Sequence, residues 1–277
     1  MRTWFITGAS RGFGELITKK ALEAGDAVIA AARKTEGLAE RFGNHPHLLA
    51  VKLDVTNEEQ AHQAVAEGIK RFGQIDILIN NAGYGLLGGV EEASKEEIEP
   101  LFATNVFGLL AVTRAILPHM RRRRSGHVIN ISSIGGYEAY QGWGVYGATK
   151  FAVEGLSEAL HQELKPLGIH VTVVEPGFFR TDFLDASSLV TSTNQISDYA
   201  DTVGVMRDFS SGANHSQPGN PAKLADAFLT LVNSANPPLR LPLGSDTVAR
   251  IEQKNRSVTA ELELWRAVAL STDFASA

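Results

Sequence analysis

The alternation of short apolar segments with amphipathic ones constrains the fold of this chain more than any other feature. The apolar segments are nearly continuous in hydrophobicity, which is typical of strands buried on both faces. They cover residues 4–7, 27–32, 48–54, 75–80, 127–131 and 170–174. Strands that alternate with helices are joined by right-handed crossovers and form parallel sheets. The sequence therefore predicts an α/β fold with a doubly wound parallel sheet of about seven strands and helices on both faces.

The amphipathic segments carry helix start and stop signals. Helical patterns over residues 15–24 and 58–72 each end at a glycine, which is the residue preferred just after a helix. Ser94 opens a capping box, with a glutamate three residues later. Pro100 predicts that this helix is kinked or restarts before it reaches Asn105.

The last third of the chain has weaker periodicity. Residues 183–220 are rich in Ser, Thr, Asn and Gly, and a connection of this length predicts a mobile or functional segment, which we expect to be a substrate lid. Helical patterns follow over residues 221–232 and 246–270, with a short edge strand at 239–241 between them. We expect one domain over 1–277, with a cofactor and catalytic core at 1–182 and the C-terminal helices and edge strand at 221–277.

Composition limits the partners and compartment. A net charge of -5 over 277 residues indicates no nucleic-acid or anionic-membrane surface, and the basic run at 121–124 is typical of a solvated helix end. The chain has no cysteine, and its eight histidines lack paired metal-ligand spacing, so we expect no metal. With neither a signal peptide nor an apolar run approaching 18 residues, we expect a cytoplasmic protein without a membrane partner.

Three glycines follow the first predicted strand in the pattern Gly8-x-x-x-Gly12-x-Gly14, and a helix follows them. Glycines let the backbone turn sharply and approach a pyrophosphate, whose charge is favoured at a helix N-terminus. The same turn could also be a tight strand-to-helix connection with no ligand.

Tyr146 and Lys150 lie four residues apart in a helical pattern, so their side chains leave one face of the helix. An ammonium group beside a phenol favours the phenolate and brings its pKa toward neutral pH. The pair therefore suits proton exchange at an alcohol or carbonyl oxygen. Seen alone, both residues could equally be surface residues of a helix.

Taken together and in order, these motifs resemble the short-chain dehydrogenase/reductase family. The resemblance rests on the glycine turn, Asn80 to Gly83, Asn105, Ser133, Tyr146 with Lys150, and Pro176 with Gly177. It covers residues 1 to about 182 and implies a Rossmann-type fold. The spacing of the glycines differs from the G-x-G-x-x-G pattern of other dinucleotide-binding proteins.

The resemblance implies a role for each of four residues. Tyr146 is the expected acid/base, and Lys150 is expected to hold the nicotinamide ribose and lower the Tyr146 pKa. Ser133 is expected to hydrogen-bond the substrate oxygen, and Asn105 to support a water that relays protons to Lys150. Ser132 is a rival to Ser133, but the thirteen-residue spacing to Tyr146 selects Ser133. A buried structural hydrogen bond would also explain Asn105 inside a helix.

The same resemblance implies the cofactor site. Its expected residues are Gly8, Ser10, Arg11, Gly12, Phe13, Gly14, Arg33, Asp54, Val55, Asn81, Ala82, Gly83, Tyr146, Lys150, Pro176, Gly177, Phe179 and Thr181. The second strand ends at Ala32, where enzymes that prefer NAD have an acidic residue for the ribose hydroxyl, and Arg33 and Arg11 could clamp a 2'-phosphate. We therefore expect NADP(H) in preference to NAD(H), although Arg33 could instead stack on adenine or face solvent.

We expect a small-molecule carbonyl or alcohol substrate in an apolar pocket, with no charged residue assigned to it. The nominated walls are Tyr84, Leu86, Tyr140, Trp143, Phe178 and Phe183, any of which could be ordinary core. The C-terminal segment is similar to that of steroid- and retinol-type members, and we expect a homo-oligomer, either a dimer or a tetramer. The alternatives are a non-catalytic NADP-binding sensor, a sugar-nucleotide epimerase or dehydratase, and a methyltransferase.

Overall fold

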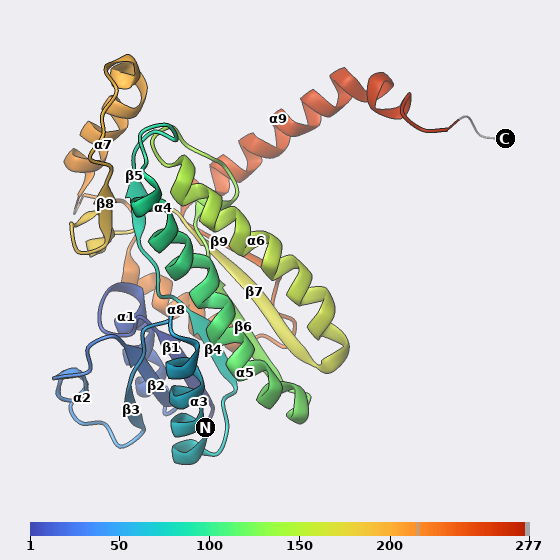
Figure 1. The fold of residues 1–277 in the computed structure, drawn as a ribbon. Helices are drawn as coiled ribbons and strands as arrows, with labels where there is room; N and C mark the ends of the chain where they lie inside the picture. The colour runs from blue at the N-terminus through green and yellow to red at the C-terminus, as the bar shows by residue number, and fades with distance from the viewer. Residues whose placement is uncertain (215, 275–277) are drawn as a thin grey trace.

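The computed structural model describes residues 1–214 and 216–274 and confirms the doubly wound parallel sheet (Figure 1). Within the described residues, seven strands pair in the order β3-β2-β1-β4-β6-β7-β9, and every pairing is parallel. The strands are β1 (Thr3–Thr7), β2 (Ala27–Ala32), β3 (Leu48–Lys52), β4 (Ile77–Asn80), β6 (Gly126–Ile131), β7 (Ile169–Pro176) and β9 (Arg240–Leu243). The strand order reverses between β1 and β4, and crevices that bind ligands form at such positions.

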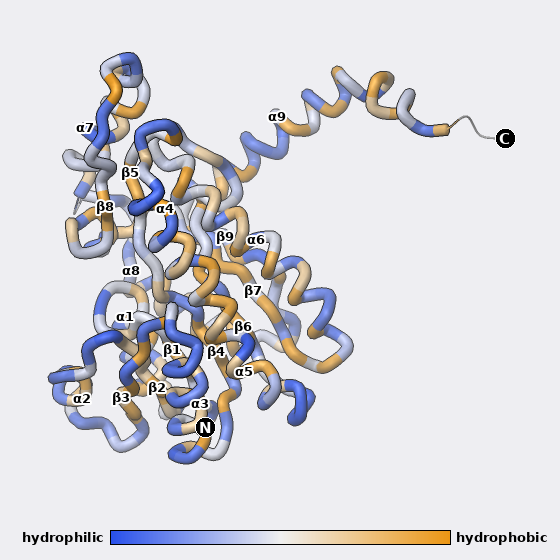
Figure 2. Tube along the Cα trace, viewed as in Figure 1, coloured by the Kyte–Doolittle hydropathy of each residue, from blue (hydrophilic) through white to orange (hydrophobic). Residues whose placement is uncertain are grey.

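Helices cover both faces of this sheet, as expected. One face carries α1 (Gly12–Glu23) and α8 (Pro221–Asn233), and the other carries α3 (Glu58–Phe72), α5 (Leu109–Arg123) and α6 (Gly144–Leu164). Successive residues of each strand point to opposite faces of the sheet, so a hydrophobic core forms on each face. Trp4 and Ile6 pack toward α1 and α8, and Phe5 packs toward α3 and α5. Figure 2 shows the strands as the most continuously apolar part of the chain.

Two helix boundaries differ from expectation. Helix α1 begins at Gly12, because the glycine turn leads directly into it. Pro100 does not end its helix: α4 (Lys95–Phe102) continues through η1 (Ala103–Gly108), a π-helical turn, into α5. Ser94 forms the expected capping box. The irregular part of the continuous helix is the π-helical turn η1, which carries Asn105. Such π turns occur often at functional sites.

The continuous helix Lys95–Arg123 is long and apolar enough to cross a membrane by length and composition. Its most apolar 18-residue window has a mean hydropathy of 1.5, and half of that window is buried inside the protein. Val112, Ile116 and Met120 on this helix pack against the sheet. Since the core helix of a globular protein has the same composition, this helix is weak evidence for a membrane.

The segment expected to be irregular contains regular elements. In order, they are η4 (Asp182–Leu184), β8 (Leu189–Thr191), η5 (Ser197–Tyr199), η6 (Ala200–Gly204) and α7 (Val205–Ala213). Strand β8 pairs in parallel with β5 (Gly85–Leu87), which follows β4. The segment therefore lies beside the carboxyl end of the sheet, above the reversal in strand order (Figure 1).

The remaining elements are short, with one exception. They are α2 (Leu38–Arg41), η2 (Ile134–Gly136), η3 (Lys165–Leu167) and the long helix α9 (Ser245–Leu270). The predicted edge strand is β9, which lies at the edge of the sheet next to β7. Helix α9 leaves the body of the protein and projects from it (Figure 1).

Candidate active site

A large cavity lies at the carboxyl ends of the strands, where the strand order reverses. Its volume is about 1440 Å³, larger than the roughly 300–1,000 Å³ of ordinary ligand pockets, so it can hold a cofactor and a substrate together. The expected site residues in its wall are Gly8, Ser10, Arg11, Gly12, Phe13, Arg33, Asp54, Val55, Asn81, Ala82, Gly83, Ser133, Tyr146, Lys150, Pro176, Gly177, Phe179 and Thr181. Gly14 and Asn105 lie behind the wall rather than in it.

The glycine turn has the geometry of an anion site. Gly8 and Gly12 have φ angles of +64° and +55°, in the left-handed region that favours glycine. A Cβ on Gly14 would overlap the Gly8 carbonyl oxygen, so this glycine permits the close packing of the turn. Arg11 is the N-cap of α1, and its guanidinium donates to the Ser187 carbonyl at 2.6 Å; no side chain caps the first N–H groups of the helix among the described residues. This cradle fits a dinucleotide pyrophosphate.

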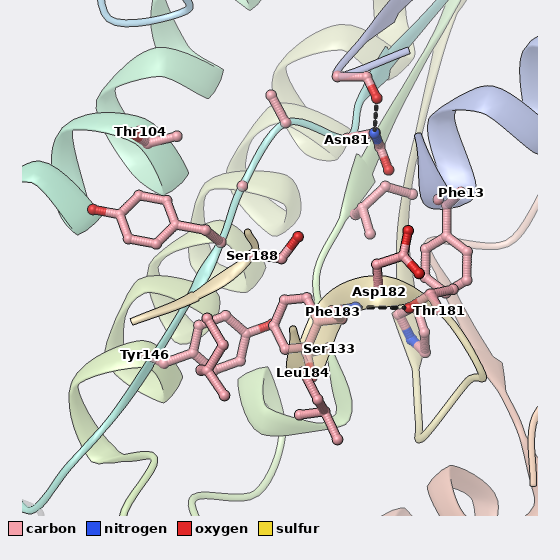
Figure 3. A pocket seen from close by; sticks show the side chains of 18 of the residues that line it. Phe13, Asn81, Thr104, Ser133, Tyr146, Thr181, Asp182, Phe183, Leu184 and Ser188 are labelled. Atoms are coloured by element: carbon pink, nitrogen blue, oxygen red, sulfur yellow. Dashed lines mark hydrogen bonds between the residues drawn. The ribbon is translucent and has the colours of Figure 1, made fainter. Parts of the chain in front are cut away.

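Asn81 fixes the end of β4 against the end of β1. Its Nδ2 donates to the Thr7 carbonyl at 2.9 Å, and the backbone N–H groups of Asn81 and Ala82 donate to the Thr7 hydroxyl at 2.9 and 3.0 Å. Figure 3 shows Asn81 beside Phe13 on one side of the pocket. The sequence did not lead us to predict this role of Thr7. Its position at the end of a strand, directly before the glycine turn, could have indicated it.

An exposed cation, Arg33, follows β2, and a hydrogen-bonded carboxylate, Asp54, follows β3. Arg33 is exposed after Ala32, the last residue of β2, and lies in the cavity wall. Asp54 accepts hydrogen bonds from the Thr56 hydroxyl at 2.7 Å and the Thr56 N–H at 3.0 Å. The Thr56 hydrogen bonds lower the pKa of Asp54 against the effect of burial, and Arg33 adds to this lowering.

Ser133 and Tyr146 lie close together in the wall. Ser133 follows β6 and begins η2, where its hydroxyl accepts from the Gly135 N–H at 3.0 Å. Tyr146 lies in the first turn of α6, and Figure 3 shows its ring close to Ser133 and Phe183. Burial raises the pKa of Tyr146 above its ordinary value, and the neighbouring Ser133 hydroxyl acts in the opposite direction.

Lys150 lies one helical turn after Tyr146 and is buried. Its Nζ donates to the Ile131 carbonyl at 2.9 Å and lies 5.7 Å from the centre of the Tyr146 ring. Burial lowers the pKa of Lys150 to about 8, against the effect of Glu154. The expectation that Lys150 lowers the Tyr146 pKa differs from the structure, because burial of the phenol dominates and the ammonium is directed to a backbone carbonyl.

Ser132 and Ser133 lie in different surroundings. Both line the cavity, but Ser132 is buried and lies beside Glu154, whereas Ser133 lies beside Tyr146. This arrangement favours Ser133, the residue that the thirteen-residue spacing to Tyr146 also selects.

Asn105 uses both amide N–H donors and one lone pair of its amide oxygen. Its Nδ2 donates to the Tyr84 carbonyl at 2.9 Å and the Thr149 hydroxyl at 3.1 Å, and its Oδ1 accepts from the Tyr84 N–H at 3.1 Å. Asn105 thus joins η1, the loop after β4 and helix α6. These bonds are the buried structural hydrogen bonds that the sequence left as an alternative to a relay role.

Aromatic side chains form the wall next to Tyr146. Trp143 makes an edge contact with Tyr146 at 5.6 Å between ring centres, and Phe183 lies 5.7 Å from Tyr146. Five of the six nominated wall residues line the cavity, but Leu86 does not: it is 1 % exposed and belongs to the core cluster with Leu101. Its strand β5 alternates between faces, and Leu86 falls on the inner one. Apolar wall residues not predicted are Leu184, Leu189, Val190, Val205, Met206 and Phe209.

The turn after β7 is held from the C-terminal helix. The carboxylate of Asp246 accepts from the Phe178 N–H at 2.8 Å, and a Cβ on Gly177 would overlap this carboxylate. Phe179 packs edge-on against Phe13 from the glycine turn at 5.6 Å, so the two halves of the cofactor side meet there.

One cation in the substrate half of the wall was not predicted. Arg250 of α9 lies 5.0 Å from the centre of the Tyr140 ring and 3.5 Å from a Glu138 carboxylate oxygen. Burial raises the pKa of Tyr140 to about 12, against the effect of Arg250. Periodicity placed residue 250 in a helix, but no local pattern shows that this helix returns to the cavity.

The segment over the cavity is anchored by a buried carboxylate. Glu92 accepts from the Gly89 N–H at 2.7 Å and the Ile196 N–H at 2.9 Å, and it pairs with Arg207 of α7. Burial raises the pKa of Glu92, but these hydrogen bonds and the guanidinium outweigh it and lower the pKa overall. Among the residues that the structure describes, no group of three His, Asp or Glu side chains is placed to hold a metal ion.

Comparison with known proteins decides the family. A family model described as short chain dehydrogenase matches residues 2–189. This chain belongs to the short-chain dehydrogenase family. A 3-ketodihydrosphingosine reductase of Bacteroides thetaiotaomicron is 41 % identical over 240 residues, which cover 86 % of each chain. A short-chain dehydrogenase from Streptomyces avermitilis has a solved structure with a TM-score of 0.92, 43 % identity and 99 % coverage of both chains.

A solved serine dehydrogenase complexed with NADP+ is 31 % identical, with a TM-score of 0.73, and the match covers 87 % of this chain and 94 % of that one. Family membership makes this short-chain dehydrogenase an oxidoreductase that acts on CH–OH or C=O groups with a nicotinamide cofactor. The glycine cradle and the cavity fit such a cofactor.

Proposed function

We propose that this short-chain dehydrogenase interconverts a ketone or aldehyde with an alcohol, using NADP(H) in preference to NAD(H) and Tyr146 as the acid/base. The observation that carries the proposal is the placement of Ser133 beside Tyr146 in the wall of the cavity, with Lys150 on the same face of α6. A non-catalytic sensor needs no phenol paired with a hydroxyl at this place.

The chemistry follows from charge that develops on the substrate oxygen. A bound nicotinamide supplies the hydride for carbonyl reduction or accepts it in alcohol oxidation. Ser133 donates a hydrogen bond to the carbonyl oxygen, and the Tyr146 hydroxyl transfers its proton to the same oxygen as negative charge builds there. Burial keeps Tyr146 protonated at neutral pH, which suits proton donation in the direction of reduction.

Lys150 and Asn105 support this step from behind. Lys150 can reach the nicotinamide ribose from its place beside the Tyr146 ring, at the cost of its hydrogen bond to Ile131. Asn105 orders the loop at Tyr84 and the helix at Thr149, and a water held near its Oδ1 would relay protons to Lys150. Trp143 and Phe183 exclude bulk water from the phenol, which strengthens each of these interactions.

The preference for NADP(H) rests on charge at the end of β2. Ala32 offers no carboxylate to a ribose hydroxyl, whereas Arg33, exposed in the cavity wall, can pair with a 2'-phosphate. Arg11 lies nearby in the glycine turn and can join it when its bond to Ser187 opens. A relative of known structure carries NADP+ in the family fold.

The substrate is proposed to be an apolar carbonyl compound. Residues 183–220 supply apolar side chains to the wall, among them Leu184, Leu189 and Phe209, and act as the lid over it. A relative with 41 % identity is named for reduction of 3-ketodihydrosphingosine, a ketone with a long apolar chain. We therefore expect catalytic efficiency to rise with the length of the alkyl chain in a series of ketones.

The decisive experiment replaces the phenol alone. Tyr146→Phe keeps the ring and its packing, so it should bind NADPH as the wild type does but lose about 10²–10⁴-fold in turnover, which is the usual contribution of a positioned acid/base. Turnover is followed by NADPH absorbance on a panel of ketones, and cofactor binding by fluorescence. Tyr137→Phe is the matched control, because the Tyr137 hydroxyl bonds to Asn255 outside the cavity. Wild-type turnover by Tyr146→Phe would remove the proposed acid/base.

A further inference from the structure

A cluster of buried charges lies behind the cavity wall, where α6 packs across β7 (Figure 1). Glu154 of α6 is 5 % exposed, and Glu175 of β7 is fully buried. Both face Arg240 of β9, whose Nη1 lies 2.9 Å from Glu154 Oε2 and 3.8 Å from Glu175 Oε1. Among the described residues, Oε1 of Glu154 and both carboxyl oxygens of Glu175 have no hydrogen-bond partner. The proposed reaction uses none of these groups.

Glu154 lies one helical turn after Lys150, on the same face of α6. Residues four apart on a helix have neighbouring side chains, and both of these side chains are buried. They also lie over the same end of β6. Lys150 Nζ donates to the carbonyl of Ile131, the last residue of β6, and Ser132, which follows it, lies beside Glu154. The helix and the strand end thus bring a carboxylate and an ammonium group together in one buried region.

Burial makes the charged form of Lys150 unfavourable. Within the described part of the chain, its Nζ makes one hydrogen bond, to Ile131, and no direct salt bridge. Burial lowers the pKa of Lys150 to about 8, and the charge of Glu154 acts in the opposite direction. A neutral amine gives no charge-assisted hydrogen bond to a ribose hydroxyl and does not favour the phenolate of Tyr146. Lys150 therefore needs an anion that acts across more than salt-bridge distance.

Of the two buried carboxyl groups, Glu154 is the one that carries the charge. It lies closer to the Arg240 guanidinium than Glu175 does. Burial raises the pKa of Glu154, but Ser132 and Arg240 act in the opposite direction. Burial and the charge of Glu154 raise the pKa of Glu175 to about 7, so Glu175 keeps its proton longer. The other titratable groups that face this cluster from the packed elements are Tyr146 and Glu158 on α6 and Tyr137 at the end of η2.

We propose that Glu154 is a positioning residue for the reaction: its carboxylate, held by Arg240, keeps Lys150 in its charged form beside Tyr146. This role rests on the proposed function, because the charge of Lys150 matters for turnover only if Lys150 serves Tyr146 and the nicotinamide ribose. The simpler role of Glu154 is structural, since it holds β9 against α6 through Arg240. Only the first role changes the protonation of Lys150.

The first experiment measures the titration of Lys150 directly. Lysine is labelled with 13C at Cε, the Lys150 signal is assigned by its loss in Lys150→Met, and its chemical shift is followed against pH. Glu154→Gln should lower the midpoint by about one to three pH units, which is the effect of an opposite charge at this separation. Glu158→Gln is the matched control, because Glu158 pairs with the same Arg240 from the surface, and it should keep the wild-type midpoint. An unchanged midpoint in folded Glu154→Gln would overturn the proposal.

Further variants separate the charge of Glu154 from its packing. Arg240 keeps Glu158 and Glu175 as partners in Glu154→Gln, so this variant should fold, which circular dichroism checks. Glu154→Leu is a second neutral variant, because an apolar side chain of similar volume often replaces a buried charge without loss of stability, and it should give the same shift. Glu154→Asp keeps the charge and should restore most of the midpoint. Glu175→Gln leaves Glu154 paired with Arg240, and a shift as large as that of Glu154→Gln would overturn the specific role of Glu154.

The pH dependence of turnover separates this role from the proposed function. In ketone reduction with NADPH, the high-pH limb of kcat should move to lower pH in Glu154→Gln by the same amount as the Lys150 midpoint, and Glu154→Asp should restore it. A midpoint that moves without the limb would support the effect of Glu154 on Lys150 and contradict the role of Lys150 in the proposed function. A midpoint that stays in place would overturn the role of Glu154 and leave the result of Tyr146→Phe unaffected.

Discussion

At the scale of single residues, the proposed preference for NADP(H) depends mainly on Arg33. It is exposed at the end of a buried strand, where the side chain before it is a methyl group and offers no carboxylate. A 2'-phosphate would give the guanidinium a bidentate partner, whereas a ribose hydroxyl would not. The proposed discrimination between NADP(H) and NAD(H) therefore rests on one charge, with Arg11 in the glycine turn as a second possible donor.

Arg33→Ala should raise the dissociation constant of NADPH about 10- to 100-fold, because a hydrogen bond to a charged group contributes about 1.5–3 kcal/mol. NADH binding should change less than about twofold, since NADH lacks the phosphate. Both constants are measured by fluorescence titration. Lys52→Ala removes a similar charge from the exposed end of β3 and serves as the control. Equal weakening of both cofactors would contradict the assigned role.

At the scale of elements, the lid is docked rather than free. Strand β8 pairs with β5, and Glu92 ties Ile196 and Arg207 to the loop before α4. The Glu92 carboxylate is buried, and its hydrogen bonds and the Arg207 guanidinium stabilise its charged form. The proposed lid is therefore held to the body through a few specific contacts of Leu189–Thr191, Ile196 and Arg207, whereas the glycine turn is fixed by backbone geometry.

Glu92→Gln should loosen the lid and leave the cofactor side intact. Removing one member of a buried ion pair costs about 3–5 kcal/mol, because the other charge stays buried without a partner. We expect faster proteolysis within residues 183–214 and a higher KM for apolar ketones, with an unchanged NADPH dissociation constant. Glu96→Gln, an exposed neighbour at the start of α4, is the control. A protease-resistant Glu92→Gln protein with wild-type KM would show that the pair does not hold the lid.

The elements also show what the sequence can and cannot predict. Periodicity and the glycine, Asn81, Ser133 and Tyr146 motifs are local, so they placed the parallel sheet and most of the cavity wall correctly. Contacts between distant segments carry no local signal, and Arg250 and Asp246 were therefore missed although both act on the cavity from α9. Asn105 is intermediate: its position in a helix called for an explanation, and its partners Tyr84 and Thr149 became visible only in the fold.

For the molecule as a whole, stability depends on charges buried between α6, β7 and β9. Glu175 of β7 is 0 % exposed, and Glu154 of α6 is nearly as buried. Arg240 of β9 donates to Glu154 at 2.9 Å, lies 3.8 Å from Glu175, and also pairs with the exposed Glu158. Lys150 lies one turn before Glu154. Burial, together with the charge of Glu154, raises the pKa of Glu175 to about 7, against the effect of Arg240.

This arrangement predicts a stability that falls as pH rises. An unfolded glutamate loses its proton near pH 4.3, whereas folded Glu175 keeps it up to about 7, so the folded state binds more protons between these values. The free energy of unfolding should therefore decrease from about pH 4 to about 7 through this group and stay lower above that range. Glu175→Gln cannot titrate, and it should flatten the decrease and be more stable than wild type at pH 8. Urea unfolding at pH 5 and pH 8 measures both effects. Glu158→Gln, which contacts the same Arg240 from the surface, should keep the wild-type slope, and a Glu175→Gln protein with that same slope would show that the buried carboxyl pair does not hold the proton.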